Sequence, residues 1–366
     1  MQVFFHLPKL QHNIRIIRDA CQQAGLQVVW VTKGCHSRHE IIDLLRTMQA
    51  EVIGDVHPAN LKQIAHTFPG ELMMVNLPPL SMIEATFPHV HTHVVSSLAH
   101  ARAISAAAQK FAKRQRVMLL VDVGNLREGI LPSDVSPMIE AMRRLPQLDV
   151  IGLGTTVGCH GGYIATERDM HRFMQIARTA ERDTRTAFEV LSVGSGTMLF
   201  DVMRDGQMPA RITQFRVGAA FLVGEKPPTH AAIAPLYQDC FIFQVEILEL
   251  LKKPSVPAGE VGYDAFGKKV VFEDLGDRLK ALLNVGMLDV DIYSLTPLFP
   301  GIRIIGGTSN YTICDVTDCR EPLEVGQLLD FRMAYSAMAK ATLSPYVKKI
   351  PITDADSLKQ PGRMGL

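Results

Sequence analysis

A lysine at the end of an apolar run is the first residue of this chain whose type and position suggest chemistry. Lys33 follows the apolar, β-branched segment 26–32, and Gly34 comes directly after it. Such a run predicts a fully buried strand, and a charge at its end needs a partner or a function. If the strand belongs to a parallel barrel, Lys33 lies on the face that carries barrel active sites. A partly desolvated amine there can form a Schiff base.

Two glycine-containing stretches could bind a phosphate group. The first, 192–197, contains Ser195 and Thr197, and the second begins with Gly218 and Ala219. Glycine lets the backbone approach an anion, amides at the start of a following helix point toward it, and the Thr197 hydroxyl can donate a further hydrogen bond. Either stretch alone could equally form an ordinary turn. Both together, after the seventh and eighth strands of an expected barrel, favour a phosphate site.

Two arginines could complete such a site. Arg216 directly precedes the second glycine stretch, and its guanidinium can only donate hydrogen bonds. Opposite a ring nitrogen it would keep that nitrogen an unprotonated acceptor, although it could instead form an ion pair at the barrel rim. Arg127 lies in the polar, glycine-flanked stretch 121–129 and could hold a carboxylate through two hydrogen bonds. Alternatively it pairs with Glu128 or Asp122 and has no catalytic role.

The elements that would position these residues alternate in type along the first part of the chain. Eight short apolar segments predict strands at 28–32, 51–54, 72–76, 92–95, 116–122, 148–152, 188–192 and 212–217. Helical periodicity appears between them, for example at 98–111 and 168–182, and an additional helix is expected at 9–24. Eight alternating units of this kind close into a parallel (β/α)8 TIM-type barrel.

After Pro227 and Pro228 the pattern changes to alternating apolar and polar residues. Antiparallel strands are predicted at 240–250, 268–272, 278–284, 301–305, 311–316 and 327–332. The predicted fold class is therefore α/β, with the barrel followed by a smaller all-β C-terminal domain. We expect the barrel to cover residues 7–228 and the β domain 229–349, with a polar, flexible tail at 350–366.

Composition excludes several classes of partner. The chain has 366 residues, and 38 basic against 37 acidic side chains leave a net charge of +1, which favours neither nucleic acid nor a membrane surface. Residues 1–6 are too short for a signal peptide core, and no apolar run is long enough for a bilayer helix, so we expect a soluble, cytoplasmic protein with a small-molecule substrate. The six cysteines follow no paired-ligand pattern and are expected to be reduced. No metal site is predicted, since Cys35, His36, His39, Cys159 and His160 lack the spacing of a ligand set.

Four motifs in order carry a resemblance to a known family. They are 31–33, 121–129, 216–219 and 257–267. Together they resemble the alanine/ornithine racemase family of fold-type III pyridoxal-phosphate enzymes, and the ornithine racemase branch is the most similar. The resemblance covers nearly the whole chain and implies a barrel followed by a β domain, pyridoxal 5′-phosphate as cofactor and a head-to-tail homodimer.

The resemblance also implies roles for individual residues. Lys33 matches the lysine that binds the cofactor as a Schiff base and acts as one base. Arg216 matches the arginine at the pyridine nitrogen, and Arg127 the arginine near the substrate carboxylate. The residues that fall where the phosphate is bound are Ser195, Thr197, Gly218, Ala219 and Tyr335.

Racemisation requires a second base, because the proton leaves one face of the α-carbon and returns on the other. The resemblance places Tyr263 in this role, contributed across the dimer interface. A nearby cation or hydrogen-bond donor would have to activate it, since free tyrosine has a pKa of roughly 10. The alternative is an interface aromatic without a catalytic role.

The chain also departs from the family pattern at two positions. Leu120 stands where some bacterial alanine racemases carry a modified lysine, and Asn310 stands where an aspartate is common, which suggests a different substrate side chain.

The sequence thus predicts a pyridoxal-phosphate-dependent racemase that interconverts the L- and D-forms of a free amino acid by two-base proton transfer. An ornithine-like or other basic amino acid is favoured, and Glu128, Asp289 or Asp291 could bind its distal ammonium group. Two alternatives remain: a metal-assisted aldolase or lyase for D-amino acids, and a non-catalytic protein that binds pyridoxal phosphate. The β domain counts against the latter, because it supplies Tyr263 and a dimer interface that a carrier does not need.

Overall fold

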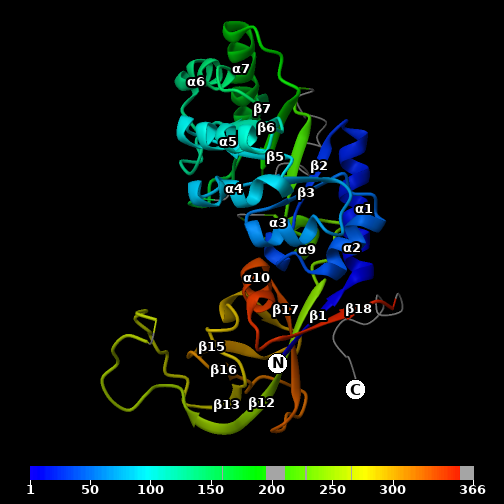
Figure 1. Cartoon of the computed structure of the whole chain (residues 1–366). Helices are drawn as coiled ribbons and strands as arrows, with labels where there is room; N and C mark the ends of the chain where they lie inside the picture. Colours follow the sequence, from blue (N-terminus) through cyan, green and yellow to red (C-terminus); the bar gives the residue numbers. More distant parts are fainter. Residues whose placement is uncertain (159, 195–210, 227–228, 265, 355–366) are drawn as a thin grey trace. The chain divides into compact units, whose positions relative to one another are not determined.

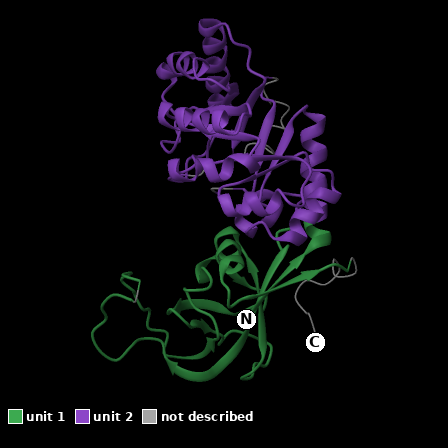
Figure 2. Cartoon of the chain, in the orientation of Figure 1, with its two compact units in different colours: residues 1–10, 237–366 green, residues 11–236 purple. Residues whose placement is uncertain are grey.

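The computed structural model describes residues 1–158, 160–194, 211–226, 229–264 and 266–354. Its contacts divide the chain into two units, which Figure 2 shows in different colours. The barrel unit is Gln11–Leu236, and the β unit joins Met1–Leu10 to Tyr237–Leu366. The division therefore falls shortly after the expected boundary at residue 228. The first residues belong to the β unit because a strand there pairs with C-terminal strands.

The barrel unit contains a closed barrel of eight parallel strands, which confirms the predicted fold class (Figure 1). In chain order the strands are β2 (Gln27–Val31), β3 (Val52–Asp55), β4 (Glu71–Met74), β5 (Thr92–Val95), β6 (Gln115–Leu120), β7 (Leu148–Thr156), β8 (Val190–Gly194) and β9 (Gln214–Val217). Each overlaps one of the eight predicted segments. Because all are parallel, their carboxyl ends lie on one face of the barrel.

Helices and short 3-10 turns connect the strands. The α-helices are α1 (Leu7–Gln23), α2 (His39–Thr47), α3 (Pro58–Ile64), α4 (Ile83–Thr86), α5 (Leu98–Lys110), α6 (Val135–Arg143), α7 (Glu167–Thr184) and α9 (Ala219–Val223). The 3-10 turns are η1 (Lys33–Cys35), η2 (Leu80–Met82), η3 (Phe87–His89) and η4 (Pro132–Asp134). Local chemistry sets some of these limits: Thr166 and Asp169 form a capping box at the start of α7.

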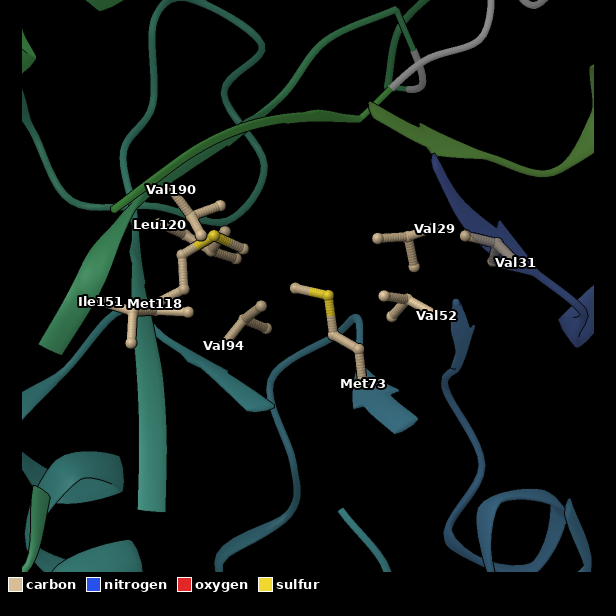
Figure 3. Close-up of a cluster of buried hydrophobic side chains, with 9 residues drawn as sticks. All are labelled: Val29, Val31, Val52, Met73, Val94, Met118, Leu120, Ile151 and Val190. Atoms are coloured by element: carbon tan, nitrogen blue, oxygen red, sulfur yellow. The ribbon is translucent and has the colours of Figure 1, made fainter. Parts of the chain in front are cut away.

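Most of the barrel interior is apolar. Alternate residues of the strands point inward, so the core is made of Val29, Val31, Val52, Met73, Val94, Met118, Leu120, Ile151 and Val190. Figure 3 shows these side chains converging between the strands. Trp30 lies between the two inward-pointing valines of β2, so its side chain is on the opposite face of the strand. It packs edge-on against Phe221, with the two ring centroids 5.4 Å apart. Leu120, a departure from the family pattern, is thus a member of this core and is 1% exposed.

The β unit is built on a mostly antiparallel sheet. Its main path runs β14-β17-β12-β13-β16-β15, and β1 joins it by antiparallel pairing with β12. The strands are β1 (Gln2–His6), β12 (Phe241–Pro254), β13 (Asp277–Leu283), β14 (Leu295–Pro297), β15 (Arg303–Gly307), β16 (Thr312–Asp315), β17 (Leu328–Met333) and β18 (Lys348–Ile352). The 3-10 turn η5 (Ile292–Ser294) and helix α10 (Tyr335–Leu343) complete it. Separately, the barrel unit has a short hairpin of β10 (Glu225–Lys226) and β11 (Ala231–Ala232).

Two features of the β unit differ from expectation. No strand forms at 268–272, where one isolated bridge joins Tyr263 to Lys269. That stretch lies in the long segment 255–276 between β12 and β13. Parallel pairing of β18 with β1 extends regular structure to Ile352, into the expected tail.

Within the described chain, no helix combines the length and apolar character needed to cross a membrane.

Candidate active site

The polypeptide around Lys33 is a tight turn at the carboxyl end of the first barrel strand. β2 ends at Val31, and Lys33 begins η1, so the lysine lies just beyond the strand rather than in it. His36 closes the turn in a left-handed conformation with φ 50°, and its amide donates to the Lys33 carbonyl. The Lys33 side chain is exposed, and no described residue is hydrogen-bonded to its amine. It is therefore accessible for chemistry at the mouth of the barrel.

Asp55, the last residue of β3, braces this turn. Its carboxylate is fully buried, and one oxygen, Oδ2, accepts from the hydroxyls of Thr32 at 2.9 Å and Ser37 at 2.7 Å. The other oxygen accepts from the amides of Val56 and His57 and from the side chain of Asn60. Because Thr32 and Ser37 flank η1, one buried carboxylate holds both ends of the segment that carries Lys33.

Arg216 points into the barrel from β9. The register pairs it with Val29 of β2 and with Gly194 of β8, and Val29 belongs to the inward-facing core. Its guanidinium donates from Nη1 to the Ser192 hydroxyl at 2.7 Å and from Nη2 to the Thr155 carbonyl at 2.7 Å. No described residue accepts from its Nε.

The close approach of β8 explains how a guanidinium fits inside the barrel. A Cβ atom at Gly194 would lie 2.7 Å from Nη2 of Arg216, so a larger residue there would require the guanidinium to shift. Burial lowers the pKa of Arg216 to about 10, while nearby Glu128 acts in the opposite direction. At neutral pH the group therefore stays protonated and offers donors only.

Arg127 lies in the loop that follows β6. The loop is closed at its base, where the amide of Asp122 donates to the carbonyl of Ile130 and that of Ile130 to Leu120. Arg127 forms a two-point ion pair with Glu128, from Nε to Oε2 and from Nη2 to Oε1. The sequence had left open an ion pair or a substrate contact for Arg127. The ion pair is present, and since a guanidinium carries five N–H groups, it does not exhaust the donors.

Several buried polar atoms at the same rim have no hydrogen-bond partner in the described structure. They are Oδ1 of Asn76, both amide atoms of Asn125 and Oγ1 of Thr155. All three residues stand at or just beyond the carboxyl ends of strands, namely β4, β6 and β7. Buried polar groups are normally paired, so this cluster is typical of a site that receives a polar ligand.

The glycine stretches are only partly described. Gly218 precedes α9 directly, and Ala219 is its first residue, so both stand at the carboxyl end of β9. Ser195 and Thr197 lie outside the described residues. At the rim, the structure therefore brings together five of the predicted site residues: Lys33, Arg127, Arg216, Gly218 and Ala219.

The remaining three predicted site residues belong to the β unit. Tyr263 is 75% exposed and lies in the segment 255–276. Asn310 is exposed in the turn between β15 and β16, where its amide donates to the Thr308 hydroxyl. Tyr335 is half-buried and is the first residue of α10. The barrel unit by itself contains none of them.

Some contributors were missed by sequence reasoning. Asp55, Ser192 and Thr156 each contact a predicted site residue or the turn that carries it. A polar residue at the carboxyl end of a buried strand was a usable signal for Asp55, as it was for Lys33. In addition, no group of three or more His, Cys, Asp or Glu side chains is gathered in metal-binding fashion among the residues described.

Comparisons with known proteins point to one family. A family model described as alanine racemase, N-terminal domain, matches residues 5–227. The ornithine racemase of Acetoanaerobium sticklandii is 30% identical over 349 residues, which cover 95% of this chain and 98% of that protein. The lysine racemase of Thermotoga maritima is 28% identical over 350 residues, again 95% of this chain and 98% of that protein.

Solved structures share the fold at lower identity. The alanine racemase of Clostridium difficile 630 superposes with a TM-score of 0.72 at 16% identity over 96% of both chains. A D-threonine aldolase from Filomicrobium marinum superposes with a TM-score of 0.71 at 13% identity, covering 93% of this chain and 88% of that one. The family model and the two racemases of nearly equal length are decisive. The chain belongs to the alanine racemase family of fold-type III enzymes, and it is a pyridoxal-phosphate-dependent amino-acid racemase.

Proposed function

We propose that this racemase interconverts the L- and D-forms of a basic amino acid such as ornithine or lysine. The observation that carries the proposal is the similarity, over almost the full length of both chains, to an ornithine racemase and a lysine racemase. The two alanine racemases found among curated proteins are matched over 70% of the chain. A basic substrate is therefore favoured over alanine.

The residues of the barrel rim fit pyridoxal 5′-phosphate. A pyridine nitrogen needs a hydrogen-bond donor, and the buried guanidinium of Arg216, anchored by Ser192 and Thr155, is a fixed set of donors. A phosphate needs backbone amides, and Gly218 and Ala219 stand at the end of the strand that carries Arg216. When bound, the cofactor withdraws electrons from the α-carbon of an amino acid and makes its proton acidic.

The chain's own groups then have separate tasks. The amine of Lys33 holds the cofactor covalently and moves the α-proton on one face of the amino acid. Arg127 binds the α-carboxylate and so orients the α-carbon toward Lys33. The hydroxyl of Tyr263 moves the proton on the opposite face. Ser195, Thr197 and Tyr335 assist Gly218 and Ala219 at the phosphate, and Asn310 contacts the substrate.

Tyr263 would act in a second copy of the chain, as part of a head-to-tail homodimer. The segment 255–276 extends from the β12–β13 hairpin as a long loop (Figure 1). Besides Tyr263 it exposes the apolar side chains Val256, Val261, Phe266, Val271, Phe272 and Leu275. Asp264 shapes its tip by accepting from the amides of Phe266 and Lys268. A long arm that exposes several apolar side chains is typical of an interface between subunits.

The carboxylate that reads the distal ammonium group is less constrained. In their own unit, Asp289 accepts from the Ser344 hydroxyl at 2.6 Å and Asp291 from the Ser294 hydroxyl at 2.7 Å, while Glu128 is paired with Arg127. Each of the three candidates therefore already has a partner.

The cytoplasmic location also stays a prediction; the five described cysteines, all free thiols, support it.

Deuterium wash-in at the α-carbon tests the function. The protein is incubated in heavy water with a panel of L- and D-amino acids, and the products are separated on a chiral phase. We expect exchange with inversion, fastest for ornithine or lysine, and its loss in Lys33→Ala together with the visible absorbance of the bound cofactor. Aldehyde release would instead favour an aldolase, and cofactor binding without exchange would favour a carrier.

Mixing two inactive variants tests the dimer. If each site combines Lys33 of one subunit with Tyr263 of the other, co-refolded Lys33→Ala and Tyr263→Phe chains form heterodimers with one intact site. Random pairing then restores about a quarter of the wild-type activity. If Tyr263 acts in its own subunit, or not at all, mixing restores nothing beyond the sum of the two variants.

A further inference from the structure

We infer that Glu128 is a positioning residue that fixes Arg127 for binding the substrate carboxylate and ties it to Arg216. The inference rests on the proposed function, because it assigns Glu128 to the same site. Both oxygens of the Glu128 carboxylate accept hydrogen bonds from one guanidinium, that of Arg127, which donates from Nε and Nη2. Such a two-point pair sets the plane of the guanidinium as well as its position.

Several contacts hold the backbone of the loop that carries the pair. The Asp122 carboxylate accepts from the amides of Gly124 at 2.7 Å and Leu126 at 3.2 Å. A Cβ atom at Gly129, whose φ is 121°, would lie 2.6 Å from the backbone nitrogen of Asp122. Arg172 of α7 donates to the carbonyl of Val123. Because the backbone on both sides of the pair is held, Glu128 transmits a defined geometry to Arg127 instead of following it.

Glu128 also reaches the second arginine of the site. The Thr156 hydroxyl donates to Oε1 of Glu128 at 3.2 Å and lies 3.3 Å from Nη2 of Arg216, from which it accepts. The three side chains Glu128, Thr156 and Arg216 therefore form one hydrogen-bonded chain from the loop to the barrel interior. Only 15% of the Glu128 side chain is exposed, so water screens these contacts weakly.

The negative charge of Glu128 offsets one of the two positive charges of Arg127 and Arg216. Arg127 and Arg216 are both cations close to one another, and each would otherwise raise the cost of placing the other at the rim. Burial alone would raise the pKa of Glu128, but its hydrogen bonds and ion pair with Arg127 outweigh burial, and its pKa is lowered. The carboxylate is therefore ionised at neutral pH. It leaves the site with one net positive charge from these three residues, which suits a carboxylate substrate.

The test uses the cofactor-loaded protein and propionate as a carboxylate probe that cannot racemise. In calorimetric titrations we expect Glu128→Gln to weaken propionate binding about 10- to 100-fold, and to raise KM more than it lowers kcat. Glu128→Asp should recover part of the affinity. The matched control is Glu140→Gln, an exposed glutamate of α6, which should behave as wild type.

A double-mutant comparison identifies the route of the effect. If Glu128 acts through Arg127, Glu128→Gln changes propionate affinity little once Arg127→Ala is present. An equal loss in both backgrounds would overturn the inference, as would a Glu128→Gln protein that binds propionate like the Glu140→Gln control. Energy transfer from Trp30, the single tryptophan, to the cofactor shows independently whether each variant is loaded. Failure of the proposed function would appear differently, as absent α-proton exchange in the wild type with propionate binding intact.

Discussion

Asp55 offers the sharpest test of how the fold supports Lys33. Replacing this fully buried carboxylate by alanine removes the acceptor of five hydrogen bonds. The Thr32 and Ser37 hydroxyls lose little, because they lie 3.0 Å apart and can bond to each other. Three donors remain without a partner: the amides of Val56 and His57 and the side chain of Asn60. At about 1 kcal/mol each, Asp55→Ala should lower the free energy of unfolding of the barrel unit by about 3 kcal/mol.

Asp55→Asn is the matched control. It keeps the oxygen that serves those three donors and presents an amide group to the two hydroxyls, which can rotate to accept. We expect a loss of less than about 1 kcal/mol. Both variants should be compared by urea unfolding followed through Trp30 fluorescence, since this tryptophan lies on β2 beside the turn and reports the barrel unit.

Loss of the brace should also affect the cofactor. In Asp55→Ala the ends of the Lys33 turn are no longer held together, so the fraction of protein carrying lysine-bound cofactor should fall, while Asp55→Asn stays near wild type. Equal stability of the two variants, with equal loading, would refute the role assigned to Asp55.

Three other perturbations have defined outcomes. Gly194→Ala should push the guanidinium of Arg216 out of place, weaken cofactor binding measured by energy transfer and leave the fold intact; unchanged affinity would contradict the close approach of 2.7 Å. Burial would raise the pKa of Asp315, but its hydrogen bond and ion pair with Arg278 outweigh this and lower it to about 2. The ionised Asp315 carboxylate should therefore add about 2 kcal/mol to the free energy of unfolding above pH 4, and this stabilisation should disappear as the pH falls through 2. Wild type and Asp315→Asn should accordingly differ in unfolding free energy at pH 7 and converge in acid. Val271→Asp, at a side chain that is 89% exposed, should shift the protein from dimer to monomer in sedimentation and lower its activity. An unchanged dimer would show that the segment 255–276 is not part of the interface.

Short-range patterns were sufficient for the barrel. Each of its strands is a buried parallel strand, which appears in sequence as a short apolar run, and each run is bounded by turn residues. Lys33 could be singled out for the same reason, because a charge directly after such a run is conspicuous. Pairing between distant segments could not be read in this way. β1 pairs with β12 and with β18, which lies near the other end of the chain, and neither β1 nor β18 has a strong pattern of its own.

The sequence alone shows which groups are available: a lysine, two arginines and two glycine stretches at or near the ends of barrel strands, in an order that resembles one enzyme family. How those groups are held depends on contacts that form only in the folded barrel. Asp55 reaches the Lys33 turn from the neighbouring strand, and Thr156 links Glu128 to Arg216 across the barrel rim. Such contacts depend on strand register and on which face each side chain occupies. These are properties of the closed sheet, in which residues far apart in the chain become neighbours.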